Sequence, residues 1–235
     1  FSFYTPCLPP TVATTTPGSR CGEGTVQLAA TTAGTNLNWY SSATGGPSLG
    51  TGSPFTTPSL NSTTSYWVEA SNNNVVSGQA KVAPTLTTPT SGGDWGLRFS
   101  VVKPMRINSV NVYLTATTAG NMVVQLKNSA GTILTQQTIA VPVGNSNAPV
   151  MHTLNLTDFN VLPGTDYRLV TGSGSVAAVR EASGNVYPYL LGSAGQIDSG
   201  YISGTSNTYY FFYNWNITEL CASTRTEVVA TVTSA

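Results

Sequence analysis

Three short stretches decide the fold of this chain: Thr25-Val26-Gln27-Leu28-Ala29, Asn36-Leu37-Asn38-Trp39-Tyr40 and Ser65-Tyr66-Trp67-Val68-Glu69-Ala70. Apolar and polar side chains alternate in them, and successive side chains of a β-strand point to opposite faces of a sheet. Nothing in this region has the 3.6-residue apolar period of an amphipathic helix. We therefore expect an all-β fold, in which Trp39 lies in a sandwich core with Leu28 and with Trp67 or Val68.

A second group of strand-like segments follows Ala83 to Gly93, a linker rich in Pro, Thr and Gly. Asn128-Ser129-Ala130-Gly131 predicts a hairpin turn between two of these segments. Their number and spacing predict a jelly-roll-like sandwich. The expected strands are Gly96–Val102, Ile107–Thr115, Met122–Lys127, Thr132–Val141, Met151–Leu156, Tyr167–Thr171, Ala177–Glu181, Gln196–Ile202 and Tyr209–Trp215.

The strand-like segment Glu227 to Thr233 follows this second group, although the first group is short of the roughly seven strands of an immunoglobulin-like (Ig-like) sandwich. We therefore expect a jelly-roll-like domain inserted before the last strand of an Ig-like domain. The predicted parts are an extended N-terminal segment over residues 1–19, an Ig-like sandwich over 20–82 plus 218–235, and the inserted sandwich over 83–217.

Several motifs of the first group resemble a bacterial Ig-like repeat that occurs in large surface adhesins of Bacteroidetes exported by the type IX secretion system. In the simple form of the repeat, the strand that corresponds to the one around Tyr66 runs directly into a segment like the one from Cys221. The resemblance also implies that the chain is extracellular, either secreted or attached to the cell surface. Residues 1–20 lie outside the pattern. The matching motifs are Cys21–Leu28, Asn38–Gly46, Leu49–Gly52, Thr56–Leu60, Thr63–Ala70 and Cys221–Thr226, and Gly96–Phe99, Val186–Tyr189 and Tyr209–Trp215 are similar to a sandwich that accompanies the repeat.

The composition excludes some partners. Only 8% of the 235 residues are charged, and nine basic residues balance nine acidic ones. A chain without net charge offers no electrostatic attraction for nucleic acid or for an acidic membrane surface. No apolar run approaches the roughly 18 residues that span a bilayer. Phe1 is not an initiating residue, so we expect that a signal peptide or other upstream sequence has been removed.

Three cysteines allow three intrachain pairings, and the sequence does not choose between them. We expect Cys21 and Cys221 to form a disulfide, because both precede strands of the Ig-like domain and the bond would clamp the insertion at its base. Against this pairing, the two strand starts lie at opposite ends of an ordinary Ig topology. Cys7 then has no intrachain partner.

The sequence offers no convincing catalytic group, so we expect a protein that is not an enzyme. His152 is the only histidine, and no Gly-x-Ser-x-Gly elbow accompanies it. The acidic residues of the second group are single and scattered, unlike a glycosidase pair. No cofactor is expected, and a structural Ca²⁺ ion held by Asp94, Asp158 and Asp166 is kept only as an alternative.

Aromatic side chains are the best binding signal, because sugars stack on exposed Tyr and Trp rings. Tyr187 and Tyr189 flank Pro188 and would point the same way in an extended segment, so they are the candidate ligand-binding residues. The six aromatic residues between Tyr209 and Trp215 are instead expected to be core, because they must line both sides of a buried strand.

The N-terminal segment is a candidate assembly contact, since apolar residues are concentrated there and its prolines favour an extended form. The alternative is that these residues cover the edge of their own sandwich. The candidate residues are Phe1, Phe3, Tyr4, Cys7 and Leu8.

Together these features predict a non-enzymatic extracellular structural or adhesive protein, a subunit or repeat of a cell-surface fibre or filament. Its expected partners are copies of itself, neighbouring repeats and surface glycans. The alternative function is a carbohydrate-binding module of a secreted enzyme or adhesin.

Overall fold

A computed structural model describes residues 8–85 and 88–234. The described chain is all-β and contains no helix, which confirms the predicted fold class. It forms two compact units, a discontinuous unit of residues 8–73 with 220–234 and a continuous unit of residues 74–219. Its strands are β1 (Val12–Thr16), β2 (Gly18–Cys21), β3 (Gln27–Thr32), β4 (Asn36–Tyr40), β5 (Gly50–Thr51), β6 (Phe55–Thr56), β7 (Thr64–Gln79), β8 (Thr88–Thr90), β9 (Trp95–Val101), β10 (Met105–Leu114), β11 (Gly120–Lys127), β12 (Ile133–Val141), β13 (Val150–Asn155), β14 (Asn160–Val161), β15 (Gly164–Thr171), β16 (Ala178–Glu181), β17 (Tyr189–Leu191), β18 (Gly195–Ile202), β19 (Thr205–Ser206), β20 (Tyr209–Tyr210), β21 (Tyr213–Ala222) and β22 (Thr226–Thr233).

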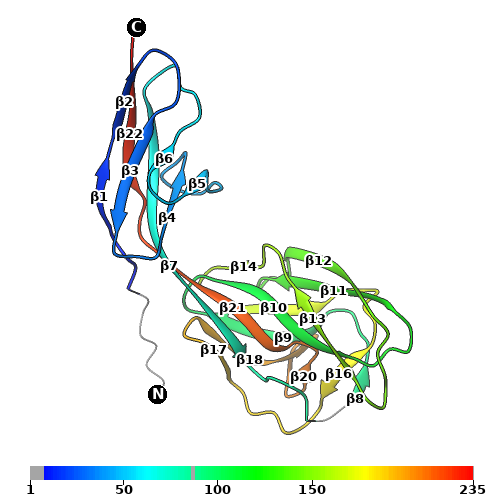
Figure 1. The fold of residues 1–235 in the computed structure, drawn as a ribbon. Coiled ribbons are helices and arrows are strands. Elements are labelled where there is room, and N and C mark those ends of the chain that lie inside the picture. The colour runs from blue at the N-terminus through cyan, green and yellow to red at the C-terminus, as the bar shows by residue number, and fades with distance from the viewer. Residues whose placement is uncertain (1–7, 86–87, 235) are drawn as a thin grey trace. The chain divides into compact units, whose positions relative to one another are not determined.

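Two sheets build the discontinuous unit (Figure 1). One has the order β1-β3-β6, and in the other β22 lies between β2 and β7, with β4 on the far side of β7 and β5 beyond β4. β22 runs antiparallel to β7, where Val228 faces Tyr66, and parallel to β2, where Ala230 faces Gly18. The C-terminal strand is therefore an interior strand of a sheet that otherwise comes from the first part of the chain.

The leading segment switches from one sheet to the other. β1 pairs with β3 in the first sheet, and after Pro17 β2 pairs with β22 in the second. Proline has no amide hydrogen to donate to a ladder, so it suits the point where the pairing changes. The sequence-based boundary left residues 1–19 outside the sandwich, whereas residues 12–21 lie in its two sheets.

Trp39 occupies the core between these sheets and is fully buried. Its ring stacks on Phe55 with 5.1 Å between centroids, and its Nε1 donates a hydrogen bond to the Gly52 carbonyl at 2.8 Å. Val68, its partner in the strand register, is also fully buried. The prediction of a core Trp39 is confirmed. Of the two neighbours that the sequence left open, Val68 lies in the core.

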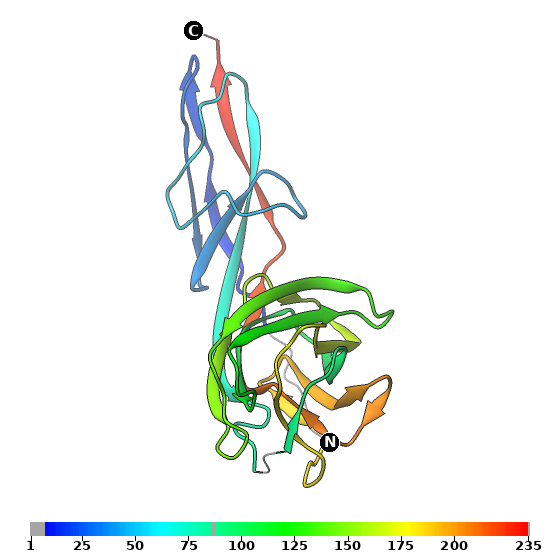
Figure 2. The same cartoon turned by 90° about the vertical axis from the view of Figure 1, so that its right-hand side faces the viewer.

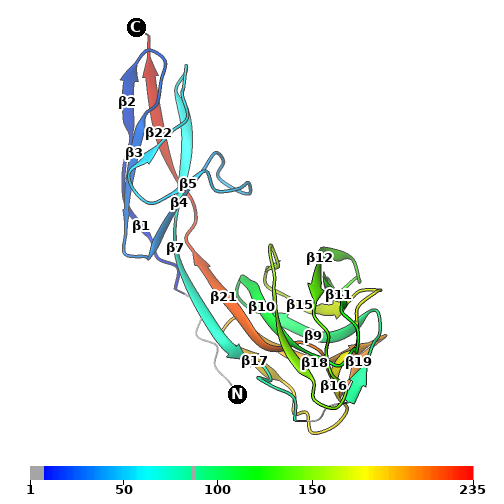
Figure 3. The same ribbon diagram turned by 45° about the vertical axis from the view of Figure 1, so that its right-hand side comes forward.

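Two sheets also build the continuous unit. The first has the order β12-β11-β15-β9-β18-β17, with β19 attached to β18 (Figure 3). In the second, β10 pairs with β13, β14, β16 and β21, and β16 also pairs with β8 and β20. The β11–β12 hairpin, green in Figure 2, turns through the predicted Asn128–Gly131 segment, where the Gly131 amide donates to the Asn128 carbonyl at 2.9 Å.

One apolar core joins the two sheets of this unit. The first eight predicted segments coincide with strands β9, β10, β11, β12, β13, β15, β16 and β18, with ends shifted by a few residues. The ninth is split between β20 and β21, because Phe211 and Asn214 have φ angles of 61° and 47°. Such left-handed residues break the alternation of a strand. Its six aromatic side chains are nevertheless buried, as expected.

Within the described residues, no helix has the length and apolar character that crossing a membrane requires.

Candidate functional site

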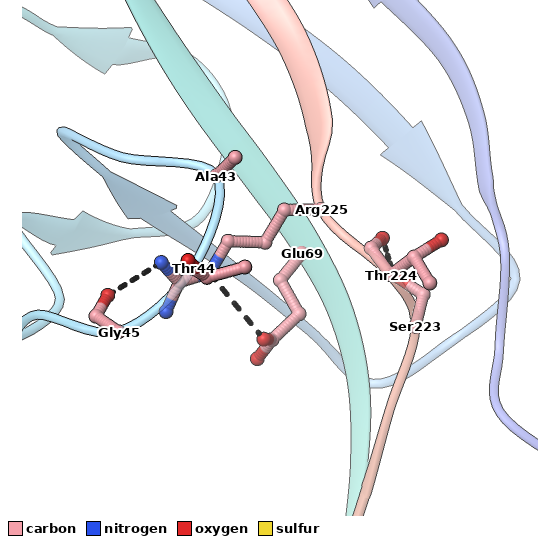
Figure 4. Close-up of a pocket in the computed structure, with 7 residues that line it drawn as sticks. All are labelled: Ala43, Thr44, Gly45, Glu69, Ser223, Thr224 and Arg225. Atoms are coloured by element: carbon pink, nitrogen blue, oxygen red, sulfur yellow. Dashed lines mark hydrogen bonds and ion pairs between the residues drawn. The ribbon is translucent and has the colours of Figure 1, made fainter.

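An arginine-centred depression lies on the discontinuous unit (Figure 4). It has a volume of about 400 Å³ and is lined by Ala43, Thr44, Gly45, Glu69, Ser223, Thr224 and Arg225. The guanidinium of Arg225 lies over the Tyr40 ring, 3.3 Å from its centroid. Nη1 donates to the carbonyls of Ser42 and Gly45 at 2.8 and 2.6 Å, and Nε lies 3.8 Å from a Glu69 oxygen.

These contacts make Arg225 a clamp for the loop between β4 and β5. The Tyr40 hydroxyl donates to Glu69 at 3.2 Å, so ring, carboxylate and guanidinium form one network. Burial and the neighbouring Glu69 carboxylate raise the pKa of the Tyr40 hydroxyl. Because the Arg225 donors already serve protein carbonyls, this depression is a structural feature. These residues lie within the sequence motifs, but their common role was not predictable because Arg225 and Ser42 lie far apart in the chain.

The predicted ligand residues Tyr187 and Tyr189 lie at the margin of the aromatic core of the continuous unit. Their rings meet edge to face at 5.1 Å, and both contact Tyr209, which is fully buried. The Tyr187 hydroxyl donates to the Thr208 carbonyl at 3.1 Å. Both rings are half-buried, and their planes stand 84° apart, so they do not form a flat platform for a sugar. Their role in ligand binding stays a prediction.

A buried ion pair lies beside these tyrosines. Glu181 is fully buried, and one of its oxygens lies 2.7 Å from Nζ of Lys81, whose side chain is 13% exposed. The other oxygen accepts hydrogen bonds from the amide and hydroxyl of Thr85 at 2.6 and 2.7 Å. Lys81 also donates to Oδ1 of Asn185 at 3.1 Å. Desolvating such a pair costs several kcal/mol per ion, so the additional hydrogen bonds are needed to hold it.

The outer face of the β9–β15 pair carries a concentrated charged network. Arg98 and Arg168 are direct partners in the register, an arrangement in which like charges repel. A bulge between Gly164 and Tyr167 places Asp166 between them, 2.7 Å from Arg98 and 3.1 Å from Arg168. Arg168 also lies over the Tyr201 ring at 4.7 Å. The network presents guanidinium and phenol groups that could hydrogen-bond a polar ligand.

The strand β12 forms an edge of the first sheet of this unit, since β11 is its partner in the strand order. Its sequence, Ile-Leu-Thr-Gln-Gln-Thr-Ile-Ala-Val, contains no charge and no proline. Ile133 and Leu134 are 46% and 50% exposed. Edge strands usually carry charges, prolines or bulges that prevent pairing with other chains. β12 lacks charges and prolines, and the register with β11 is interrupted only at Leu134, so the stretch Thr135–Val141 is the part of this edge that can accept a further strand.

The predicted Cys21–Cys221 disulfide is wrong, because Cys21 carries a free and exposed thiol. In the strand register Cys21 faces Thr233, at the far end of β22, whereas Cys221 precedes that strand. Eight strand residues at about 3.3 Å each separate the two positions, and a disulfide requires Cα atoms within about 7 Å. The Cys21 thiol instead donates to the Ser234 carbonyl at 3.3 Å.

The N-terminal assembly residues fall mostly outside the described part of the chain. Phe1, Phe3, Tyr4 and Cys7 lie in residues 1–7, which the structure does not describe. Leu8 is described and is 89% exposed, so it does not cover the edge of its own sandwich.

Three of the carboxylates considered for catalysis or calcium binding contact other side chains. Asp94 pairs with Lys127 at 2.6 Å, and Asp166 is shared by two arginines. Asp198 accepts from Ser100 and Gln196 at 2.6 and 2.8 Å. In residues 8–85 and 88–234, no three His, Cys, Asp or Glu side chains gather in a group that could hold a metal ion.

Comparison with protein families finds a match in the N-terminal part of the chain. Residues 9–89 match the family model of the Ig-like domain that is CHU_C associated. The chain contains an Ig-like domain. The match covers about a third of the 235 residues and names no ligand or reaction. The match includes the loop that Arg225 contacts but not Arg225 itself, and no curated protein matches the sequence.

Proposed function

We propose that the chain is a non-enzymatic extracellular protein with a structural or adhesive role, acting as a subunit or repeat of a cell-surface fibre. The observation that carries this proposal is the uncharged β12 edge with its exposed Ile133 and Leu134. The Ig-like match over residues 9–89 supports it, because the resembling repeats belong to secreted surface adhesins.

Strand addition explains how such an edge would act. An extended segment from a neighbouring copy would satisfy the free amides and carbonyls of β12 and would cover the exposed apolar side chains. The segment from Phe1 to Pro10 is the proposed donor, since its sequence is apolar and rich in proline, a composition that favours strand addition by an extended chain. The lack of net charge removes long-range repulsion between copies.

Electron microscopy of the full chain, under oxidising conditions and at high protein concentration, tests this function. We expect filaments or ordered oligomers, which deletion of Phe1 to Pro10 abolishes while both units stay folded. Equal assembly of the truncated chain, or separate single particles of the full chain, would contradict the proposal.

The charged network around Asp166 favours a second candidate function, a carbohydrate-binding module. Arg98, Arg168 and Tyr201 offer donors and a ring face to a polar ligand such as a surface glycan. A glycan array with the full chain tests it, with Arg168→Gln as the variant and Lys103→Gln as the matched control. Binding that Arg168→Gln removes and Lys103→Gln keeps would support this function, and no binding at any concentration would reject it.

A further inference from the structure

The chain places an amine, a carboxamide and a buried carboxylate next to one another. Nζ of Lys81 lies 3.1 Å from Oδ1 of Asn185 and 2.7 Å from an oxygen of Glu181. We propose that Lys81 and Asn185 join in an intramolecular isopeptide bond, and that Glu181 transfers the protons of this reaction.

Backbone contacts hold the amine in place. Ala80 has a left-handed conformation, with φ of 60°, and its amide donates to the Leu190 carbonyl at 3.0 Å. The carbonyl of Lys81 accepts from the amide of Asn214 at 2.9 Å. The side chain is thereby directed toward Glu181 and Asn185, with Nζ 6.0 Å from the centroid of the buried Tyr209 ring.

Further hydrogen bonds hold the carboxamide. Nδ2 of Asn185 donates to the backbone carbonyls of Glu181 and Asn207, at 2.7 and 3.0 Å. Its Oδ1 therefore faces Nζ of Lys81, and the carbonyl carbon is one bond beyond that oxygen. Attack requires a short movement of the flexible lysine side chain from the oxygen to the carbon. Such prior alignment of reacting groups removes much of the entropic barrier.

The environment of Glu181 suits proton transfer. The carboxylate is fully buried and has an oxygen 2.7 Å from Nζ of Lys81, so it can accept a proton directly from that amine. A lysine becomes a nucleophile when it loses its proton. The nearby Tyr187 and Tyr209 rings limit access of water, which would compete as the nucleophile.

The reaction balances without an oxidant or a cofactor. Glu181 takes a proton from the Lys81 ammonium, and the freed lone pair of Nζ forms a bond to Cγ of Asn185. The tetrahedral carbon collapses, the Cγ–Nδ2 bond breaks, and a proton released by Nζ reaches Nδ2 through Glu181. Nδ2 leaves as ammonia, so the chain loses about 17 Da. The product links the segment after β7 to the loop before β17.

Mass spectrometry of the reduced full chain tests the proposal. We expect an intact mass about 17 Da below that of the sequence, no tryptic cleavage after Lys81, and one branched peptide that contains Lys81 and Asn185. The variants Lys81→Arg and Glu181→Gln should restore the full sequence mass, and the matched control Lys103→Arg should keep the deficit.

Two results would overturn the proposal. One is an unmodified intact mass for the full chain. The other is a deficit that persists in Lys81→Arg, since that result would assign the lost ammonia to cyclisation of an asparagine. Lys81→Arg keeps the positive charge beside Glu181, so near-ultraviolet circular dichroism can show that this variant is folded when its mass is measured.

Discussion

Replacement of Trp39 by alanine tests the packing account of the Ig-like domain. The ring is fully buried, stacks on Phe55 at 5.1 Å and donates to the Gly52 carbonyl at 2.8 Å. Removing a buried Trp side chain costs about 3–5 kcal/mol of unfolding free energy, and the lost hydrogen bond accounts for about 1 kcal/mol of that change. Trp39→Phe keeps most of the stacking on Phe55, so the free energy of unfolding should fall by only about 1–2 kcal/mol.

Hydrogen exchange is the suitable assay, because it reports on the two units separately where a single melting curve would not. Protection should fall for amides of β3, β4 and β22 in Trp39→Ala. Trp67→Ala is the matched control, since Trp67 lies on the opposite face of β7 from the core residue Val68 and is only half-buried. A fall in unfolding free energy of less than about 1 kcal/mol in Trp39→Ala, or an equal fall in Trp39→Ala and Trp67→Ala, would show that Trp39 is not a core residue.

Three further predictions concern the polar contacts. Arg225→Lys should lower the local stability of the β4–β5 loop by about 1–3 kcal/mol, because lysine cannot bind both loop carbonyls and the Tyr40 ring. Hydrogen exchange of the amides of residues 41–49 measures this loss. Unchanged exchange would show that Arg225 does not hold the loop. Asp166→Asn should lower the free energy of unfolding by about 1 kcal/mol, and by less in high salt, because it leaves Arg98 and Arg168 facing each other. Urea titration of Asp166→Asn, with Asp158→Asn as the control, measures this loss. Equal urea midpoints for the two variants would show that Asp166 does not stabilise the arginine pair. Burial raises the pKa of Tyr187, Tyr209 and Tyr213, so the folded state keeps their protons above pH of about 10. The free energy of unfolding therefore keeps its full value below that pH and falls above it by up to about 1.4 kcal/mol per pH unit for each tyrosine. Absorbance at the phenolate band, followed together with circular dichroism, should show that these tyrosines ionise only when the protein unfolds. Ordinary titration of the three tyrosines in the folded protein would contradict their burial.

The strands were predictable from the sequence because their signal is local. Alternation in Asn36–Tyr40 identified β4, Tyr167–Thr171 was placed as one of the evenly spaced strand-like segments and coincides with β15, and Trp39 was correctly expected in the core. Two central contacts of the candidate sites were not predictable, because they join residues more than a hundred positions apart: Lys81 with Asn185 and Arg225 with Ser42.

Two errors have the same kind of cause. The left-handed conformation of Phe211 follows from tertiary packing, since phenylalanine carries no turn signal, and Asn214, a residue type that tolerates this conformation, was taken as part of a continuous strand. The Cys21–Cys221 pairing assumed that strand starts are neighbours, whereas the parallel pairing of β2 with β22 places Cys21 beside Thr233. Both depend on which strands meet, and a single sequence without its pairing pattern does not contain that information.

The proposed function requires that copies of the chain associate through the β12 edge. Sedimentation velocity of the full chain over a range of protein concentrations tests it most directly, with Leu134→Lys as the variant and Val186→Lys, at an exposed loop position, as the matched control. We expect a sedimentation coefficient that rises with protein concentration for the full chain and for Val186→Lys, and that stays at the monomer value for Leu134→Lys. A monomer at every concentration for the full chain, or equal association of Leu134→Lys, would contradict it.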